Sequence, residues 1–424
     1  MSSARKIAVK VLTDINSKKA YSNISLNSAF DSAELSPEDK AFATALVYGV
    51  LDRMITLDFV LSEFIKTSLT RVKPFTLEVL RTALYQIMYM DKVPQSAAVN
   101  EAVNIIKKSK ESFNASFVNG VLRNILRKGI SLPESESIED MAVRYSCPMW
   151  IIKSICDDYG IEETKKFLSS SLEKPPVTLR VNTLKTDTDS LIKMLENENI
   201  KAVKGKAPDS ADILCGMDFK RNKAFKNGFF HIQDAVCQLS VSKLSPKSGE
   251  RVLDMCAAPG GKSFTMAQIM ENCGEILSCD LYENRVKLIS DGAKRLGIDI
   301  IKPIVNDATV YNEDLGLFDA VLCDVPCSGL GVIGRKPEIK YKPQDDFSSL
   351  EEIQKKILMN ADKYLKAGGR LVYSTCTVRK NENENVVKAF LDKYKGYELK
   401  YQHTFMPHKD KTDGFYFALL YKSR

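Results

Sequence analysis

After Lys247 the sequence alternates short apolar segments with stretches long enough to form helices. The apolar segments are RVLDM, EILSCD, IIKPIV, AVLCD and RLVYST. This alternation is typical of an α/β domain with a mainly parallel sheet, because two parallel strands need a crossover connection that is usually a helix. We therefore predict a Rossmann-like α/β domain over residues 236–424.

The first part of the chain has a different pattern. Segments such as KAFATALVYGVL, LEVLRTALYQIMYM and FVNGVLRNILRK repeat apolar residues at helical spacing. Pro74 and Pro94 fall between such segments, where they separate one helix from the next. We predict an all-α bundle over residues 1–131.

A mixed region over residues 132–235 joins these two parts. It starts with the polar, acidic run SLPESESIED, which is typical of a linker. Helices are expected near Met149–Tyr159 and Glu162–Leu172, and the segment VTLRVNTL is expected to be rich in β structure. The sequence therefore predicts a linker followed by a small α+β module.

Composition narrows the classes of function. Apolar residues make up 44% of the 424-residue chain and charged residues 27%, as in soluble globular proteins. The N-terminus has basic residues among its apolar ones, and no later stretch approaches a spanning length, so we expect no membrane segment and a cytoplasmic location. The ten cysteines are then expected to be reduced. His231, His403 and His408 are too scattered for a zinc site, so no metal is expected.

Charge is unevenly distributed along the chain. The net charge of +7 permits a nucleic-acid partner without requiring one. Residues 1–131 hold 18 basic and 12 acidic side chains, residues 132–235 hold 15 and 17, and residues 236–424 hold 28 and 25. Most of the positive excess therefore lies in the N-terminal part.

The first strand of the α/β domain runs directly into a small-residue turn and then a helix. Small residues let backbone N–H groups approach a ligand at the N-terminus of such a helix. The dinucleotide pattern G-x-G-x-x-G does not occur here, and a Walker A loop would need Gly where Cys256 stands. A nucleoside-type methyl donor is thus favoured over a nucleotide. The turn consists of Cys256, Ala257, Ala258, Pro259, Gly260, Gly261 and Lys262.

Two acidic residues follow the next strands. Asp280 ends the second strand, about 26 residues after Asp254, where a doubly wound fold places an acid within reach of a ribose hydroxyl pair. Asp307 follows the third strand and is expected beside an adenine. Each carboxylate alone is equally well explained as a cap of the next helix or turn. Together with the small-residue turn they favour a nucleoside pocket.

Two cysteines follow the fourth and fifth strands at the same edge of the sheet. The fourth strand leads into DVPCSG, with Asp324 and Cys327, and the fifth leads into TCT, with Cys376. Carbon 5 of a pyrimidine becomes nucleophilic only after a thiolate adds to carbon 6, so this pair predicts methylation of that carbon. Asp324 is placed to hydrogen-bond the N3 and N4 edge of the base. Residue chemistry alone does not decide which thiol is the nucleophile.

The site residues also have plainer explanations. A single cysteine is usually a packing residue, and we assign Cys256, Cys273, Cys279 and Cys323 to that role. An enzyme that methylates an exocyclic nitrogen is expected to have an aromatic residue after the Asp-x-Pro turn, to stack the base. Cys327 stands at that position, which favours carbon 5.

Longer motifs resemble a known family. DMCAAPGGKS, LCDVPCSGLGVIGRKPEIK and LVYSTCTVRKNENENVV closely resemble motifs of the Fmu/Sun family of RNA m5C methyltransferases, and LRVNTL, HIQDAVCQLS and DGFYFALL add weaker matches. SARKIAVKVLTDI, DKVPQSAAVNEAV and FVNGVLRNILR look like the NusB-like RNA-binding domain of one bacterial subgroup, the RsmB type. That subgroup modifies a cytosine in 16S ribosomal RNA. The resemblance covers nearly the whole chain.

The resemblance implies a role for each site residue. It implies that Cys376 is the nucleophile and that Cys327 assists product release. Thr377 stands where the family frequently has Ser, a departure that we do not expect to disturb the thiol. S-adenosylmethionine is the implied cofactor, in a pocket formed by Cys256, Ala257, Ala258, Pro259, Gly260, Gly261, Lys262, Asp280, Asp307 and Asp324.

A base inside a stacked helix is out of reach, so the RNA must present its cytosine in a loop or flip it into the site. Lys336 and Lys340 follow the first cysteine motif and are expected to meet the substrate strand. We expect a monomer. The alternatives are an RNA-binding protein that has lost its activity and a DNA cytosine methyltransferase with Cys327 as nucleophile. Three basic runs are candidate phosphate contacts, although such runs are more often solvated faces: Lys107-Lys108-Lys110, Arg123-Arg127-Lys128 and Lys220-Arg221-Lys223-Lys226.

Overall fold

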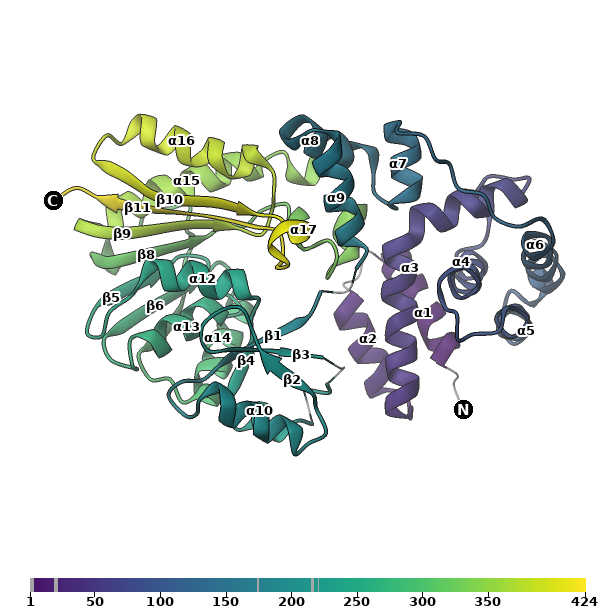
Figure 1. Cartoon of the computed structure of the whole chain (residues 1–424), viewed down its shortest axis with the longest axis horizontal. Helices are drawn as coiled ribbons and strands as arrows, with labels where there is room; N and C mark the ends of the chain where they lie inside the picture. Colours follow the sequence, from purple (N-terminus) through teal and green to yellow (C-terminus); the bar gives the residue numbers. More distant parts are fainter. Residues whose placement is uncertain (1–3, 19–21, 174, 215–216, 220) are drawn as a thin grey trace. The chain divides into compact units, whose positions relative to one another are not determined.

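The computed structural model describes the chain except for residues 1–3, 19–21, 174, 215–216 and 220 (Figure 1). The chain divides into two compact units. The first unit comprises Met1–Leu172 and Lys336–Lys342, and the second comprises Glu173–Arg335 and Pro343–Arg424. The first unit thus includes a short segment from far along the sequence.

The main part of the first unit is a set of α-helices, as the sequence predicts. Pro74 is the first residue of one helix and Pro94 directly precedes another, so both prolines separate helices. The longest helix starts after Ser36, whose hydroxyl accepts a hydrogen bond from the Asp39 N–H. The helices are α1 Ala4–Lys18, α2 Ser22–Asp31, α3 Pro37–Phe64, α4 Pro74–Tyr89, α5 Gln95–Lys107, α6 Ala115–Lys128, α7 Ile138–Arg144, α8 Met149–Tyr159 and α9 Ile161–Ser171.

The predicted linker ends earlier than its composition indicates. The helix α7 begins inside the acidic run, because the Ser137 hydroxyl accepts from the Asp140 N–H and caps the first turn. The two helices expected after the linker are α8 and α9, and they belong to the first compact unit.

The second unit begins with a small antiparallel sheet, which confirms the expected α+β module. Its strand order is β2-β3-β1-β4, and the central strand β1 carries Leu179 and Val181 into a small core with Phe230. The elements are β1 Val177–Val181, α10 Thr188–Glu196, β2 Ala202–Lys204, β3 Ser210–Ile213, α11 Lys223–Lys226 and β4 Phe230–Ile232.

The larger sheet of the second unit has the order β10-β11-β9-β8-β5-β6-β7. The five strands predicted from the sequence pair in parallel, and β10 and β11 extend the sheet as an antiparallel pair. Only these last two strands were not expected. The elements are α12 Ala235–Leu244, β5 Arg251–Asp254, α13 Gly261–Ile269, β6 Glu275–Asp280, α14 Glu283–Leu296, β7 Ile301–Val305, β8 Phe318–Asp324, α15 Leu350–Tyr364, β9 Leu365–Thr375, α16 Glu384–Lys393, β10 Tyr397–Phe405, α17 Pro407–Asp410 and β11 Phe415–Lys422.

Helices cover both faces of this sheet (Figure 1). Alternate residues of one strand enter opposite cores, so Val321 packs with residues of α15 and α16 while Leu322 packs with residues of α12, α13 and α14. The strand order changes direction between β5 and β8, the place where open α/β sheets bind ligands.

Two further findings concern the part of the chain that the structure describes. No helix there combines the length and the apolar character needed to cross a membrane. No group of three or more His, Cys, Asp or Glu side chains there is arranged to hold a metal ion. Lys220, a member of one basic run, lies outside the described residues.

Candidate active site

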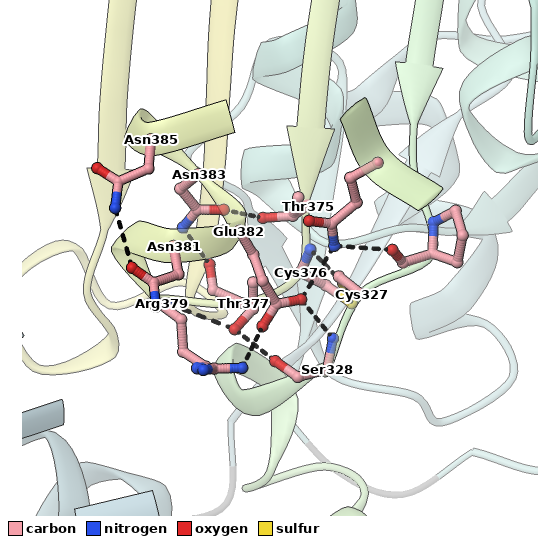
Figure 2. Close-up of polar contacts among 12 residues, drawn as sticks. Cys327, Ser328, Thr375, Cys376, Thr377, Arg379, Asn381, Glu382, Asn383 and Asn385 are labelled. Atoms are coloured by element: carbon pink, nitrogen blue, oxygen red, sulfur yellow. Dashed lines mark hydrogen bonds and ion pairs between the residues drawn. The ribbon is translucent and has the colours of Figure 1, made fainter. Parts of the chain in front are cut away.

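The two cysteines of the predicted site are in contact. Cys327 follows β8 and Cys376 follows β9, and their Sγ atoms are 3.2 Å apart (Figure 2). The backbone N–H of Cys376 also donates to the Cys327 Sγ, at 3.3 Å. Both side chains are half-buried. The parallel strands therefore bring to one place two thiols that are far apart in the sequence.

The contact between the two thiols affects the pKa of Cys327. The hydrogen bond with Cys376, together with burial, raises the pKa of the Cys327 thiol well above its ordinary value. Cys327 therefore keeps its proton at neutral pH. A protonated Cys327 can donate its S–H to the Cys376 sulfur.

Hydrogen bonds join the two cysteine loops directly. The Val325 N–H donates to the Ser374 carbonyl and the Gly331 N–H donates to the Cys376 carbonyl, each at 3.0 Å. The Ser328 and Thr377 hydroxyls are 2.8 Å apart. These contacts on both sides of the sulfur atoms hold the two loops in register.

A buried carboxylate close to the thiols forms hydrogen bonds that hold both cysteine loops in place. Glu382 is fully buried, and its Oε2 accepts from the Ser328 N–H at 2.8 Å and from the Gln354 Nε2 at 3.0 Å (Figure 2). Its Oε1 lies 3.3 Å from the Arg379 Nη1. The same Gln354 amide donates to the Pro326 carbonyl. One carboxylate thus connects the Cys327 loop, α15 and the segment after Cys376.

The next residue, Asn383, holds the backbone on both sides of Cys376. Its Oδ1 accepts from the Thr375 hydroxyl at 2.5 Å, and its Nδ2 donates to the Thr377 carbonyl at 3.0 Å (Figure 2). Asn383 is fully buried. Glu382 and Asn383 were not predicted as site residues, because the run KNENEN has the composition of a solvated surface. The sequence feature that could have indicated these two residues is the position of the run directly after the TCT turn.

Asp324 is held by two donors at the end of β8. Lys262 Nζ donates to its Oδ2 at 2.7 Å, and the Ser374 hydroxyl donates to its Oδ1 at 2.7 Å. The Asp324 side chain is still 30% exposed, so it can be reached by a ligand. Lys262 belongs to the small-residue turn, and this ion pair therefore connects the predicted cofactor turn with the predicted base-binding residue.

The small-residue turn fits a nucleoside with an anionic tail. Gly260 has φ of +110°, in the left-handed region that favours glycine, and α13 starts directly after it. No side chain caps this helix, so its first backbone N–H groups face the turn. Such a helix N-terminus suits a carboxylate. Asp280 lies beside the turn and accepts from the Ala258 N–H at 3.3 Å.

The acidic residues predicted for the cofactor differ in their surroundings. Asp280 is buried and accepts from the Tyr282 N–H, and Arg285 forms an ion pair with it at 3.3 Å. Asp307 is exposed and accepts from the N–H and the hydroxyl of Thr309, so it caps the turn after β7. Its part in cofactor binding stays a prediction.

A third carboxylate, Asp254, lies under the turn. It is buried at the end of β5, where it accepts from the Ser263 hydroxyl at 2.7 Å. Burial raises the pKa of Asp254 to about 7. The acid is therefore partly protonated at neutral pH.

Two sequence-based assignments are wrong. Cys273, which we expected to be a packing residue, is exposed, whereas Cys279 and Cys323 are buried as expected. Lys340, which we expected to meet the substrate, is only 1% exposed in the first unit. Its Nζ donates to the backbone carbonyl of Asp52 at 2.7 Å and to the carboxylate at 2.9 Å.

The other basic candidates remain accessible. Lys336 is exposed, and so are the basic side chains of the three runs as far as the structure describes them. Exposure is common to phosphate contacts and to solvated faces, so these assignments stay predictions.

Comparisons with known proteins agree with this architecture. The profile of the NusB family matches residues 2–127, that of an RsmF/B-like ferredoxin-like domain matches 147–215, and that of 16S rRNA methyltransferase RsmB/F matches 241–421. The chain is 43% identical over 406 residues to a probable ribosomal RNA small subunit methyltransferase B from Bacillus subtilis, covering 93% of this chain and 90% of that protein. It is 33% identical to ribosomal RNA small subunit methyltransferase B from Vibrio vulnificus, covering 94% and 95%. These matches confirm the predicted NusB-like bundle.

Solved structures give the same result. The protein PH0851 superposes with a TM-score of 0.85 at 27% identity, with 99% of each chain covered. NSun6 from Pyrococcus horikoshii superposes with a TM-score of 0.60 at 25% identity, covering 65% of this chain and 98% of that one, and was solved with SFG, an analogue of S-adenosylmethionine. S-adenosylmethionine is the cofactor of this methyltransferase fold. The chain belongs to the 16S rRNA methyltransferase RsmB/F family.

Proposed function

We propose that this protein methylates carbon 5 of a cytosine in small-subunit ribosomal RNA, with Cys376 as the nucleophile and Cys327 assisting release. The observation that carries the proposal is the contact of 3.2 Å between the two thiols at the carboxyl ends of adjacent parallel strands. The relatives named as small subunit rRNA methyltransferases support the choice of substrate.

The proposed reaction uses the contact between the two thiols. Cys376 Sγ forms a bond to carbon 6, and the electron pair of the double bond moves into the ring, which makes carbon 5 nucleophilic. When bound, S-adenosylmethionine would supply an electrophilic methyl group to that carbon and would leave as a neutral thioether. A base then takes the carbon 5 proton, and the electron pair of that C–H bond restores the double bond between carbons 5 and 6. The carbon 6–sulfur bond breaks, and its electron pair returns to Cys376. The protonated Cys327 donates a hydrogen bond to that sulfur as its charge returns.

Asp324 and the turn are proposed to hold the two substrates. The carboxylate of Asp324 accepts a hydrogen bond from the N4 amino group of the base, while Lys262 keeps the carboxylate in place. The residues from Cys256 to Lys262, with Asp280 and Asp307, bind the cofactor. Backbone N–H groups at the start of α13 would bind its carboxylate.

In this proposal the three predicted domains have different functions. Residues 236–424 carry the reaction, and residues 1–131 and 132–235 bring the RNA to it. The excess of basic over acidic residues in the first part supports this division. A cytoplasmic location agrees with a ribosomal RNA substrate, and a monomer is sufficient because the chain itself has both RNA-binding parts.

The covalent step can be tested with RNA that contains 5-fluorocytosine. Fluorine on carbon 5 cannot leave as a proton, so elimination is blocked and the enzyme stays attached to the RNA. We expect wild type to form an adduct that is stable on a denaturing gel, and Cys376→Ala to form none. With ordinary RNA, Cys327→Ala is expected to accumulate an adduct because release is slowed.

Cys273→Ala is the matched control, because Cys273 is an exposed thiol outside the site. It should behave as wild type. Loss of the adduct in Cys327→Ala but not in Cys376→Ala would reverse the two roles and support the DNA-type arrangement. Methyl transfer without any adduct would exclude the carbon 5 mechanism. No transfer from labelled cofactor to 16S RNA would favour a binding protein that has lost its activity.

A further inference from the structure

The helical unit has a pocket that the proposed reaction does not use. It has a volume of about 390 Å³ and lies between the C-terminal end of α3 and one face of α6. This volume is within the range of sites that hold small organic groups. We call it the α3–α6 pocket. It is lined by Phe64, Ile65, Lys66, Thr67, Ser116, Phe117, Gly120, Val121 and Asn124.

Gly120 in this pocket has no packing explanation. Two other glycines inside helices are required by their neighbours, because a Cβ on Gly49 would lie 2.1 Å from the Tyr85 ring and one on Gly292 would lie 2.4 Å from the Phe264 ring. A Cβ on Gly120 would meet nothing within 4 Å. Glycine is also among the least favourable residues in a helix interior. What the missing side chain provides is open space in the pocket.

Aromatic side chains form part of the pocket and its surroundings. Phe64 and Phe117 line it, and Phe117 is 37% exposed. Phe113, shortly before α6, is 71% exposed. Proteins that bind single-stranded RNA stack unpaired bases on such exposed rings. Asn124 adds an amide that can hydrogen-bond the edge of a base.

The charges around the pocket match a polyanion. Lys66 is charged and no acidic residue is among those that line the pocket. The helix α6 carries three basic residues and no acidic one, with Arg127 and Lys128 in its last turn. Glu111, before α6, is engaged by the N–H and hydroxyl of Thr76. A protein partner that inserted an apolar side chain would gain nothing from this charge, whereas RNA phosphates would.

We propose that the α3–α6 pocket holds one unstacked base of single-stranded RNA, with the flanking phosphates on Lys66, Arg127 and Lys128. This rests on the proposed function in taking RNA as the substrate. The base stacks on Phe117, and Gly120 leaves room for it. The pocket therefore contributes to RNA binding in the helical unit and takes no part in methyl transfer itself.

The test uses the full-length protein and a short fluorescein-labelled single-stranded RNA, beside an abasic strand of the same length. Gly120→Leu places a side chain in the pocket, at a position where a Cβ meets nothing within 4 Å. It is expected to weaken binding of the intact strand by about 5- to 150-fold, the range for one stacked base. Binding of the abasic strand should not change. Phe117→Ala is expected to act in the same direction.

Gly120→Ala separates stability from binding. It is expected to raise the thermal midpoint of unfolding by about 2–4 °C, because alanine favours the helix, while it weakens binding of the intact strand. Asn104→Leu is the matched control, since it places a leucine at an exposed position of α5 outside the pocket. Its affinity for both strands should equal that of wild type.

The outcomes distinguish this proposal from the proposed function. If Gly120→Leu binds the intact strand as wild type does, or loses the intact and abasic strands equally, the pocket holds no base, whatever the methyl transfer activity. The other outcome is that Gly120→Leu binds the intact strand more weakly and the abasic strand as wild type does, while wild type transfers no methyl group to ribosomal RNA. That result would support the base-binding pocket and contradict the proposed function.

Discussion

Removal of the Glu382 carboxylate should misplace the Cys327 loop. In Glu382→Ala the N–H of Ser328 and the side-chain amide of Gln354 lose a shared acceptor inside the protein. Each buried donor left without a partner costs about 1–3 kcal/mol, so the two together reduce the free energy of unfolding by about 2–6 kcal/mol. Since Ser328 directly follows Cys327, a displacement on the order of 1 Å at this loop is expected to lower kcat by about 10²-fold.

Glu382→Gln should be much milder. The amide oxygen can occupy the place of Oε2 and accept from both Ser328 and Gln354, so only the contact with Arg379 is lost. Arg379 is 17% exposed and can turn towards water. We expect a stability loss of about 1 kcal/mol and a kcat within a few-fold of wild type.

The assay combines calorimetric unfolding with single-turnover methyl transfer and the rate of adduct formation on 5-fluorocytosine RNA. Glu384→Ala is the matched control from the same run, because Glu384 is half-buried and accepts from the Thr404 hydroxyl outside the site. A positioning role predicts slower adduct formation at unchanged affinity for the cofactor. Equal losses in Glu382→Gln and Glu382→Ala would refute hydrogen-bond acceptance as the cause, and full activity of Glu382→Ala would refute the anchoring itself.

Two further predictions concern Asp254 and the thiol pair. In the folded state Asp254 keeps its proton up to about pH 7, whereas in the unfolded chain it releases the proton near pH 4. This group therefore makes the free energy of unfolding fall as pH rises between these values, by on the order of 4 kcal/mol at most. Thermal unfolding of Asp254→Asn should show a shallower fall from pH 4 to pH 7 than wild type, and parallel curves would contradict this. Diamide should take two electrons and two protons from Cys327 and Cys376 and convert their 3.2 Å contact into a disulfide. The disulfide is detected as a mass loss of two hydrogen atoms and as activity that returns with dithiothreitol. Persistent free thiols at both positions would refute that geometry.

The elements and the convergence of the site could be predicted from sequence because both follow local rules. Strand and helix periodicity located the five parallel strands, and parallel strands deliver their following loops to one edge. Cys327 and Cys376 are therefore together for a topological reason. The raised pKa of the Cys327 thiol depends on a contact of 3.2 Å between the two sulfur atoms, which no spacing in the sequence encodes.

The sequence-based predictions were wrong or missing for polar residues whose burial depends on partners far away in the sequence. Glu382 belongs to a run whose composition is typical of an exposed surface. Its burial is possible because the Ser328 N–H and the Gln354 amide donate hydrogen bonds to its carboxylate. The sequence predicts Lys340 as a substrate contact, but Asp52, far away in the sequence, accepts two hydrogen bonds from its Nζ inside the helical unit. Sequence composition gives the charge of a residue, but it does not give the partner that the residue contacts after folding.

The segment Lys336–Lys342 has a consequence for synthesis of the protein on the ribosome. It belongs to the helical unit, where Lys340 donates to Asp52 and the Tyr341 hydroxyl donates to the Leu51 carbonyl. The helices of that unit leave the exit tunnel first, but these buried bonds cannot form until the chain has grown past residue 342. The part of the protein that is translated first is thus completed only after most of the methyltransferase unit has been made.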